Sequence, residues 1–216
     1  MGDHRTDDEH RTDDEHRTSK GELTRRAILD TAIERFGHHG YRATSVAEIT
    51  RDAGVGGTVA YAYFDNKEAL FLAALDEDAA AVIHEGLSEF MDDPNSTWRL
   101  TLVLSLVEAL DRHPLARRVL SGLEPGVTDR VIELPALMEL RKAVVERLRA
   151  DQAAGLVRPD VDADAMGNGA VTIIVSLLMS ILQFGRRGVA DYGPDVFAVF
   201  EAALGRPPEW PAMGPP

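Results

Sequence analysis

Apolar residues recur at every third or fourth position through most of the chain, and no segment alternates regularly between apolar and polar residues. In the first third, Val46, Ile49 and Ala53 form a narrow apolar face that ends at Gly54. This spacing is typical of an amphipathic helix, and glycine enters left-handed backbone conformations without steric cost. The pattern therefore predicts a short helix, a sharp turn at Gly54 and a second helix over about 57–64.

The first of these two helices carries its own start signal. Thr44 or Ser45 can cap the helix by accepting a backbone N–H group. Glu48 lies three residues after Ser45, so its carboxylate can bond back to the cap and complete a capping box. Val55, directly after the turn, is expected to fill the gap between the two helices.

The same helical period continues beyond this motif and predicts an all-α fold. Proline, glycine and capping residues separate the apolar stretches, and each stretch is long enough for one helix. The expected helices cover about 66–92, 97–113, 115–121, 128–154, 162–183 and 195–204.

Four segments near the N-terminus resemble the tetracycline-repressor (TetR) family of bacterial transcription regulators. They are residues 24–41, 44–49, 53–55 and 61–70, and the resemblance extends over about residues 22–75. It implies an N-terminal three-helix helix-turn-helix DNA-binding domain, followed by a larger helical ligand-binding and dimerisation domain. It also implies a homodimeric repressor that a small, hydrophobic ligand releases from a palindromic operator in double-stranded DNA.

Transferred residue by residue, the resemblance also assigns the DNA contacts. It implies that bases are contacted by Gly57, Thr58, Tyr61 and Ala62. It also implies that phosphates are contacted by Thr44, Ser45, Tyr63 and Lys67. Hydroxyl and backbone N–H groups at a helix start suit a phosphate, and Lys67 adds positive charge. A packing role within the small domain remains an alternative for Tyr61 and Tyr63.

Some positions depart from the family pattern. Gly56 stands where a serine usually caps the second helix, and Thr50 and Ala60 stand where an alanine and a larger apolar residue are usual. Gly57 and Ala62 offer almost no side chain for hydrogen bonding. Base recognition is therefore expected to rely on the remaining contacts and on DNA shape.

The expected domain boundaries follow changes in composition. Residues 1–20 repeat the hexapeptide His-Arg-Thr-Asp-Asp-Glu without an apolar face, which favours a disordered tail. The DNA-binding domain is expected at 21–67, with its motif at 45–64, and the effector-binding and dimerisation domain at 68–206. Residues 207–216 form a proline-rich tail.

The formal net charge of −13 is unusual for a nucleic-acid-binding protein. Residues 21–67 contain six basic and six acidic side chains, whereas residues 68–216 carry a net charge of −10. The DNA-binding segment is thus the least acidic part of the chain, and its few cations predict a modest salt dependence of binding. Histidines in the repeat of residues 1–20 allow a metal site as an alternative, but a solvated tail is favoured because no fixed geometry holds them.

The helices expected at 162–183 and 195–204 are more apolar than the surface of a monomer requires. Gly169, Ser176 and Ser180 form a small-residue stripe that permits close helix contact, which favours a dimer interface over an internal helix. The same domain is expected to hold the effector in an adaptable apolar cavity. The candidate lining residues, for which an ordinary core role is the alternative, are Trp98, Leu102, Leu106, His113, Met138, Met166 and Asn168.

Other protein classes find less support. The chain has no cysteine and no nucleophile or phosphate-loop motif, so we expect no enzyme, no cofactor and no metal. The charged N-terminus and an apolar run limited to residues 170–182 predict a cytoplasmic protein without a signal peptide or membrane span. The alternative from another class is a helical ligand-binding or interaction protein with weak or no DNA recognition.

Overall fold

The computed structural model describes residues 5–91, 98–127, 131, 133–185, 195–196 and 198–205, with side chains from residue 20 onward except residues 89–91. Within these ranges all regular structure is helical and no strand occurs. The expected all-α fold is therefore confirmed.

Eight helical elements can be given bounds in the described part of the chain. They are α1 (Arg5–His39), α2 (Val46–Asp52), the 3₁₀ helix η1 (Val59–Ala62), α3 (Lys67–Met91), α4 (Trp98–Ala109), α5 (Pro114–Leu120), α6 (Pro135–Ala153) and α7 (Ala163–Phe184). A further short helical segment covers residues 198–204.

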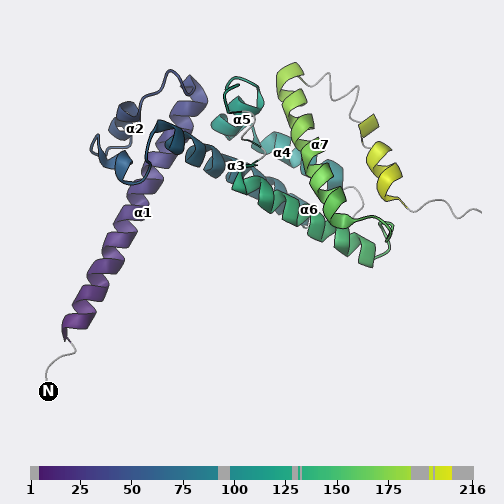
Figure 1. Cartoon of the computed structure of the whole chain (residues 1–216), viewed down its shortest axis with the longest axis horizontal. Helices are drawn as coiled ribbons and strands as arrows, with labels where there is room; N and C mark the ends of the chain where they lie inside the picture. The colour runs from purple at the N-terminus through teal and green to yellow at the C-terminus, as the bar shows by residue number, and fades with distance from the viewer. Residues whose placement is uncertain are drawn as a thin grey trace, which may run out of the picture.

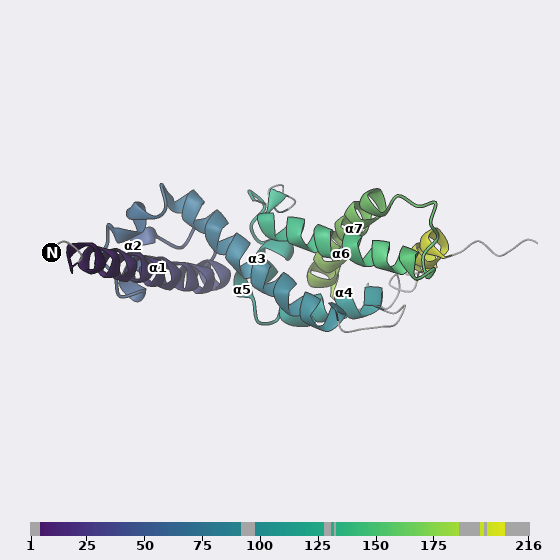
Figure 2. The same ribbon diagram turned by 90° about the horizontal axis from the view of Figure 1, so that it is seen from below.

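The molecule is elongated (Figure 1, Figure 2). Residues 20–66, with α2 and η1 packed beside α1, lie at one end and are called the N-terminal unit below. The helices α3 to α7 and the segment 198–204 form the helical body. Helix α3 runs from the N-terminal unit into the body, so it belongs to the packing of both parts.

The core of the N-terminal unit is built on one face of α1. Ile28 and Phe36, eight residues apart, are fully buried, and Ile49 of α2 packs into the same core. Phe71 of α3 meets the ring of Phe36 edge-on at a centroid distance of 5.1 Å and that of Tyr41 at 5.2 Å. This aromatic cluster joins the N-terminal unit to the body.

The helical body is held together by close approaches between α3 and α4 and between α6 and α7. Both contacts depend on glycine. A Cβ atom on Gly86 of α3 would lie 2.6 Å from the side chain of Leu106, and one on Gly167 of α7 would lie 2.5 Å from that of Val145. Real Cβ contacts are essentially never this short, so a larger residue at either position would force the facing side chain or the helices to shift.

Helix α7 is long and apolar enough to cross a membrane by length and composition, with a mean hydropathy of 1.9 over 18 residues. The apolar run of residues 170–182 was too short to predict a membrane span, but α7 extends beyond this run at both ends. However, α7 buries one face, including Val171, Ile174 and Leu178, in the core of the body. This buried face makes up 39% of the apolar 18-residue window, and the core helix of a folded domain can have the same composition.

Several helix boundaries differ from those expected. Helix α1 begins at Arg5 and includes most of the repeat, which was expected to be irregular. A helix satisfies its backbone hydrogen bonds internally, and arginine and glutamate have good helix propensity, so no apolar face is needed. Helix α6 begins at Pro135 rather than near 128, because proline fits the first turn of a helix. The tail at 207–216 lies outside the described residues.

Candidate nucleic-acid interface

The first helix of the motif starts as its sequence predicts. The Ser45 hydroxyl accepts from the backbone N–H of Glu48 at 3.2 Å, and the Glu48 carboxylate accepts from the backbone N–H of Ser45 at 2.9 Å. Both halves of the capping box are therefore present. The Ser45 hydroxyl also donates to the Glu48 carboxylate at 2.8 Å. This hydrogen bond and the one from the Ser45 backbone lower the pKa of Glu48, and the guanidinium of Arg35 acts in the same direction.

The turn and the second helical element of the motif follow α2 directly in the chain. Gly54 has a φ of +69°, and the backbone N–H of Val55 returns to the carbonyl of Thr50 at 2.9 Å. The second element, η1, is a single 3₁₀ turn over Val59–Ala62 without a side-chain cap, shorter than the helix expected over 57–64. Thr58 occupies the cap position of η1, but its hydroxyl makes no capping hydrogen bond, and 3₁₀ turns are stable only over a few residues.

Residues assigned to base contacts come together on the outside of this element. Tyr61 is 56% exposed, and Gly57, Thr58 and Ala62 are also exposed. Thr58 and Tyr61 are three residues apart, and positions with this spacing eclipse each other in a 3₁₀ helix. No heavy atom outside the local backbone approaches Gly57 within 4 Å of where its Cβ would lie. The surface is open and offers a hydroxyl and a phenol.

Among the residues assigned to phosphate contacts, Thr44 is a correction. Its side chain is 2% exposed, and its hydroxyl donates to the carbonyl of Arg35 at 3.3 Å. A hydroxyl placed there stabilises the α1–α2 corner and is not open to a phosphate. Ser45 and Tyr63 are exposed, and the Nζ of Lys67 lies 4.3 Å from the ring centroid of Tyr41.

Three arginines of the N-terminal unit, Arg26, Arg35 and Arg51, pair with carboxylates. Arg35 bonds to Asp52 through Nε at 2.6 Å and also contacts Glu48, while Arg26 pairs with Asp30 at 2.8 Å. The hydrogen bond from Arg35 holds the pKa of Asp52 below its ordinary value. These pairs leave fewer cations for phosphates, in agreement with the balanced charge of residues 21–67.

Two adjacent short helical elements, a glycine turn between them and an exposed second element define a helix-turn-helix DNA-binding protein. The larger helical body attached to it is typical of a regulator whose DNA binding is controlled by a second site. The family model for bacterial regulatory proteins of the tetR family matches residues 28–74. The chain belongs to the TetR family and is a DNA-binding transcription regulator.

Named relatives agree with this assignment. The chain is 28% identical to the transcriptional repressor AcnR of Corynebacterium diphtheriae over 172 residues, which cover 76% of this chain and 83% of AcnR. It is 31% identical to the transcriptional repressor Rv1474c of Mycobacterium tuberculosis over 150 residues, which cover 66% of this chain and 73% of that protein.

Among solved structures, the fold is similar to that of the regulator FadR from Bacillus subtilis in complex with stearoyl-CoA. The TM-score is 0.61 at 17% identity, and the match covers 82% of this chain and 97% of FadR. At this identity the likeness is one of fold.

A central apolar cavity lies between α3, α4, α5, α6 and α7. About 50 Å³ of it is open to water-sized molecules. Every lining side chain is aliphatic: Leu75, Ala79, Val82, Ile83, Leu106, Leu110, Ala116, Val119, Leu120, Val131, Leu134, Leu137, Leu140, Val175 and Leu178. Leu106 is thus the one residue of the expected effector set that lines this cavity.

The other expected effector residues are divided between several places. Trp98 and Met166 line a second cavity at the outer end of the body, and Leu102 is fully buried without lining either cavity. Met138 is 63% exposed on α6, and Asn168 is exposed on α7. Met138 and Asn168 are corrections, because both lie on helix faces that point away from the cavities.

His113 is held by carboxylates rather than left open to a ligand. Its Nδ1 lies 2.8 Å from the buried carboxylate of Asp78, and its Nε2 lies 3.1 Å from Glu85. Asp78 also accepts from the backbone N–H groups of Leu115 and Ala116 at 3.0 and 2.8 Å. This network fixes the start of α5 against α3.

Sequence patterns could have identified two buried acids of the helical body, Asp78 and Asp151. Asp78 lies three residues after the buried Leu75 on α3, and Asp151 lies three residues after the buried Leu148 on α6. A carboxylate on the apolar face of a helix predicts a buried, hydrogen-bonded acid.

Among the described side chains, no group of three His, Cys, Asp or Glu residues could hold a metal ion. The histidines of the repeat lie outside those side chains.

Proposed function

We propose that the protein is a cytoplasmic, homodimeric repressor that binds a palindromic operator and is released when a small apolar ligand enters the helical body. The central cavity is the observation that carries this proposal, because α3 and α5 both line it and both contact the N-terminal unit. We assign it a regulatory rather than an enzymatic role. The named repressors among its relatives disfavour a protein of this fold without DNA binding.

The contact between α5 and α1 supports a mechanical link from cavity to DNA. A Cβ atom on Gly37 of α1 would lie 2.7 Å from the Cβ of Pro114, so the two backbones are in close contact. Ala116 and Val119, on the same short α5, line the central cavity. The backbone N–H of Tyr41 also donates to Glu124, just after α5, at 3.1 Å. Movement of α5 would therefore displace the N-terminal unit.

The size of the central cavity supports a conformational response to the ligand. Space of about 50 Å³ for water-sized molecules is far below the roughly 300–1,000 Å³ of a typical ligand pocket. A ligand must push the lining helices apart, and it thereby favours a conformation other than the one described. That FadR was solved with stearoyl-CoA supports the idea that this fold can open around a ligand with a long apolar chain.

The exposed face of α7 supports the dimer. Gly169, Ser176 and Ser180 are all exposed, and no heavy atom lies within 4 Å of where a Cβ of Gly169 would be. The hydroxyls on this face already donate to carbonyls one turn earlier, Ser176 to Thr172 and Ser180 to Ser176, each at 2.9 Å. The face can therefore be buried against a second copy without leaving polar groups unsatisfied.

The first experiment is a selection of bacterial genomic fragments by the purified full-length protein, followed by titration of the enriched fragment at two salt concentrations. Enrichment of one palindrome would support the proposal, with two recognition elements about one DNA turn apart. Because few cations are available, we expect a shallow dependence of affinity on salt. Absence of any enriched sequence, from protein shown by mass spectrometry to carry no ligand, would overturn the proposal.

The dimer is tested separately by light scattering. Ser176→Arg places a charge in the proposed interface and is expected to yield monomers, whereas Ala150→Arg on the exposed face of α6 should leave the dimer intact. A wild-type protein that is monomeric at micromolar concentration would contradict the homodimer.

A further inference from the structure

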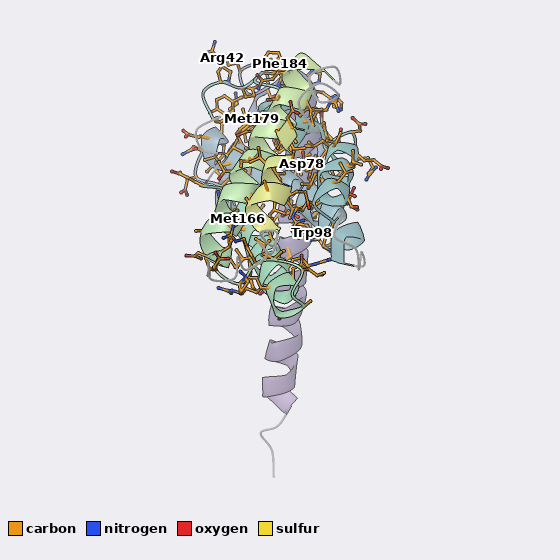
Figure 3. All side chains as sticks on the ribbon, turned by 90° about the vertical axis from the view of Figure 1, so that its right-hand side faces the viewer. Arg42, Asp78, Trp98, Met166, Met179 and Phe184 are labelled. Carbon is orange, nitrogen blue, oxygen red and sulfur yellow. The ribbon has the colours of Figure 1, made fainter. Side chains whose placement is uncertain are left out.

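A second cavity lies at the outer end of the helical body, away from the N-terminal unit. It is enclosed by α4, α6, α7 and the segment 198–204, and it shares no lining residue with the central cavity. About 20 Å³ of it is open to water-sized molecules. Figure 3 faces this end of the molecule and labels Trp98 and Met166, two of the lining residues.

The lining of this cavity is apolar apart from one cation and one indole N–H group. Val103, Val144, Leu148 and Leu177 are typical lining residues, and the cation is Arg99. The side chain of Arg99 is 12% exposed, and its guanidinium carbon lies 4.9 Å from the ring centroid of Trp98. A nearly buried cation in an apolar cavity attracts an anion that also carries an apolar chain.

The neighbouring charges are already matched within the body. Asp151 accepts from the indole N–H of Trp98 at 2.8 Å and from Nε of Arg147 at 3.1 Å. Asp151 is 5% exposed, so this group is a fixed part of the core. Its carboxylate therefore compensates the charge of Arg147 and orients the indole that forms one wall of the cavity.

Arg99 differs, because its carboxylate partner comes from a distant and exposed part of the chain. Glu201 bonds to Nη1 of Arg99 at 3.1 Å and is 65% exposed. Glu201 belongs to the short segment 198–204, whose Phe200 and Leu204 also line the cavity. Burial lowers the pKa of Arg99, while the carboxylates of Glu201 and Asp151 act in the opposite direction. Because Glu201 is exposed, its carboxylate can return to water when another carboxylate takes its place on Arg99.

We propose that this cavity binds a monocarboxylate with a medium-length alkyl chain. The ligand carboxylate takes the place of Glu201 on Arg99, and the chain extends between Val144, Leu148 and Met166. The segment 198–204 shifts outward, which opens the narrow space that the lining side chains now fill. A neutral ligand takes the Glu201 carboxylate away from Arg99 without replacing it, and a dicarboxylate buries an extra charge, so both bind less well.

This assignment rests on the proposed function, because it gives a chemical class to a ligand of the regulatory body. It concerns a different cavity from the central one. The central cavity contains no polar side chain and offers nothing that distinguishes a carboxylate from an alcohol.

The test is a titration of the full-length protein with sodium octanoate and, in parallel, with 1-octanol. Trp98 lies in the cavity wall, and Trp210 is the second of the two tryptophans. A Trp210→Phe background therefore makes the fluorescence of Trp98 the specific signal. We expect saturable binding of octanoate, at least about tenfold tighter than that of octanol, because a charge-assisted hydrogen bond distinguishes the two.

Two variants test the role assigned to Arg99. Arg99→Gln should weaken octanoate about tenfold or more and leave octanol unchanged. Glu201→Gln removes the competing carboxylate from an exposed position, so it should keep the fold and tighten octanoate severalfold. Arg149→Gln is the matched control, because Arg149 is 56% exposed, pairs with Asp164 and does not line the cavity.

Equal affinity for octanoate and octanol, no saturable signal, or unchanged octanoate affinity in Glu201→Gln would each overturn the carboxylate site. The fluorescence titration needs no DNA, so its result is independent of the operator selection. Octanoate binding without an enriched operator would leave the site intact and contradict the repressor. An enriched operator without octanoate binding would contradict the site alone.

Discussion

The N-terminal unit and the helical body place their functional residues differently. In the N-terminal unit, Thr58 and Tyr61 lie on the outside of a single 3₁₀ turn and support no core packing. In the body, both cavities are lined by core residues of four or more helical segments. DNA contacts can therefore change with little effect on folding, whereas a change in ligand contacts also changes the stability of the core.

Two contacts connect the N-terminal unit to the helical body. A substitution at either contact should therefore affect both regions. The aromatic cluster joins Phe36 and Tyr41 of the N-terminal unit to Phe71 of α3. The close approach of Gly37 to Pro114 joins α1 to α5. A substitution at either contact is expected to reduce stability and DNA binding together, and a substitution in only one region should separate these two properties.

The largest effect is expected from Phe71→Ala. Phe71 is fully buried in the aromatic cluster, and truncating a buried phenylalanine costs about 3–5 kcal/mol. The free energy of unfolding, measured by urea titration, should fall by this amount, and operator binding should be lost. Leu104→Ala is the control, because Leu104 is 57% exposed on α4 and should change stability by less than about 0.5 kcal/mol. Wild-type operator affinity in Phe71→Ala would show that the cluster does not connect the two regions.

A smaller effect on both properties is expected from Gly37→Ala. The added methyl group would lie 2.9 Å from the backbone nitrogen of Leu115 as well as close to Pro114, so α1 and α5 must separate. Overpacking of this kind costs about 1–3 kcal/mol. Gly57→Ala makes the same chemical change where no heavy atom lies within 4 Å, and its unfolding curve should match that of the wild type. Equal urea midpoints for the two variants would contradict the close approach of α1 and α5.

Sequence reasoning succeeded where the interactions are local. The capping box of Ser45 and Glu48 spans three residues and is present as their spacing predicts. Thr44 shows the limit of this reasoning. Two adjacent hydroxyls could both cap or contact phosphate, and packing against Arg35 of α1 decides that Thr44 turns inward.

The cavities could not be predicted, because their walls come from residues far apart in the chain. Arg99 and Glu201 are separated by 102 positions, and no periodicity connects them. Met138 was expected in a cavity because methionine adapts to irregular apolar spaces. The same apolar side chain can lie exposed at a helix surface, and only the packing of α6 against α3 and α7 determines which face is covered.

Tyr61→Ala should lower operator affinity without the loss of stability expected for Phe71→Ala. A base contact contributes about 1–3 kcal/mol, so operator affinity should fall by about tenfold to a hundredfold. Stability should change by less than about 0.5 kcal/mol, because Tyr61 is 56% exposed. Leu156→Ala, at 55% exposure in the body, should change neither property. Unchanged operator affinity in Tyr61→Ala would remove Tyr61 from the proposed DNA interface.

The smallest effect concerns the acid stability of α2. The pKa of Glu48 in the folded protein is held below its ordinary value of 4.5, first by its hydrogen bonds to Ser45. The unfolded chain therefore binds this proton more readily than the folded protein does. The contribution of Glu48 to stability is complete above pH 4.5 and is lost as the pH falls below it through the folded-state pKa.

Glu48→Gln sharpens this prediction, because glutamine keeps the capping-box hydrogen bond and does not titrate. Wild type should lose more protection of the α2 backbone amides than the variant does when the pH is lowered through 4.5, as measured by hydrogen exchange. Asp52 also has a lowered pKa, but it is present in both proteins, so the difference between them reports Glu48. The cavities and their lining helices should respond equally in the two proteins. Identical acid sensitivity of α2 in both would mean that the carboxylate charge adds nothing to the cap.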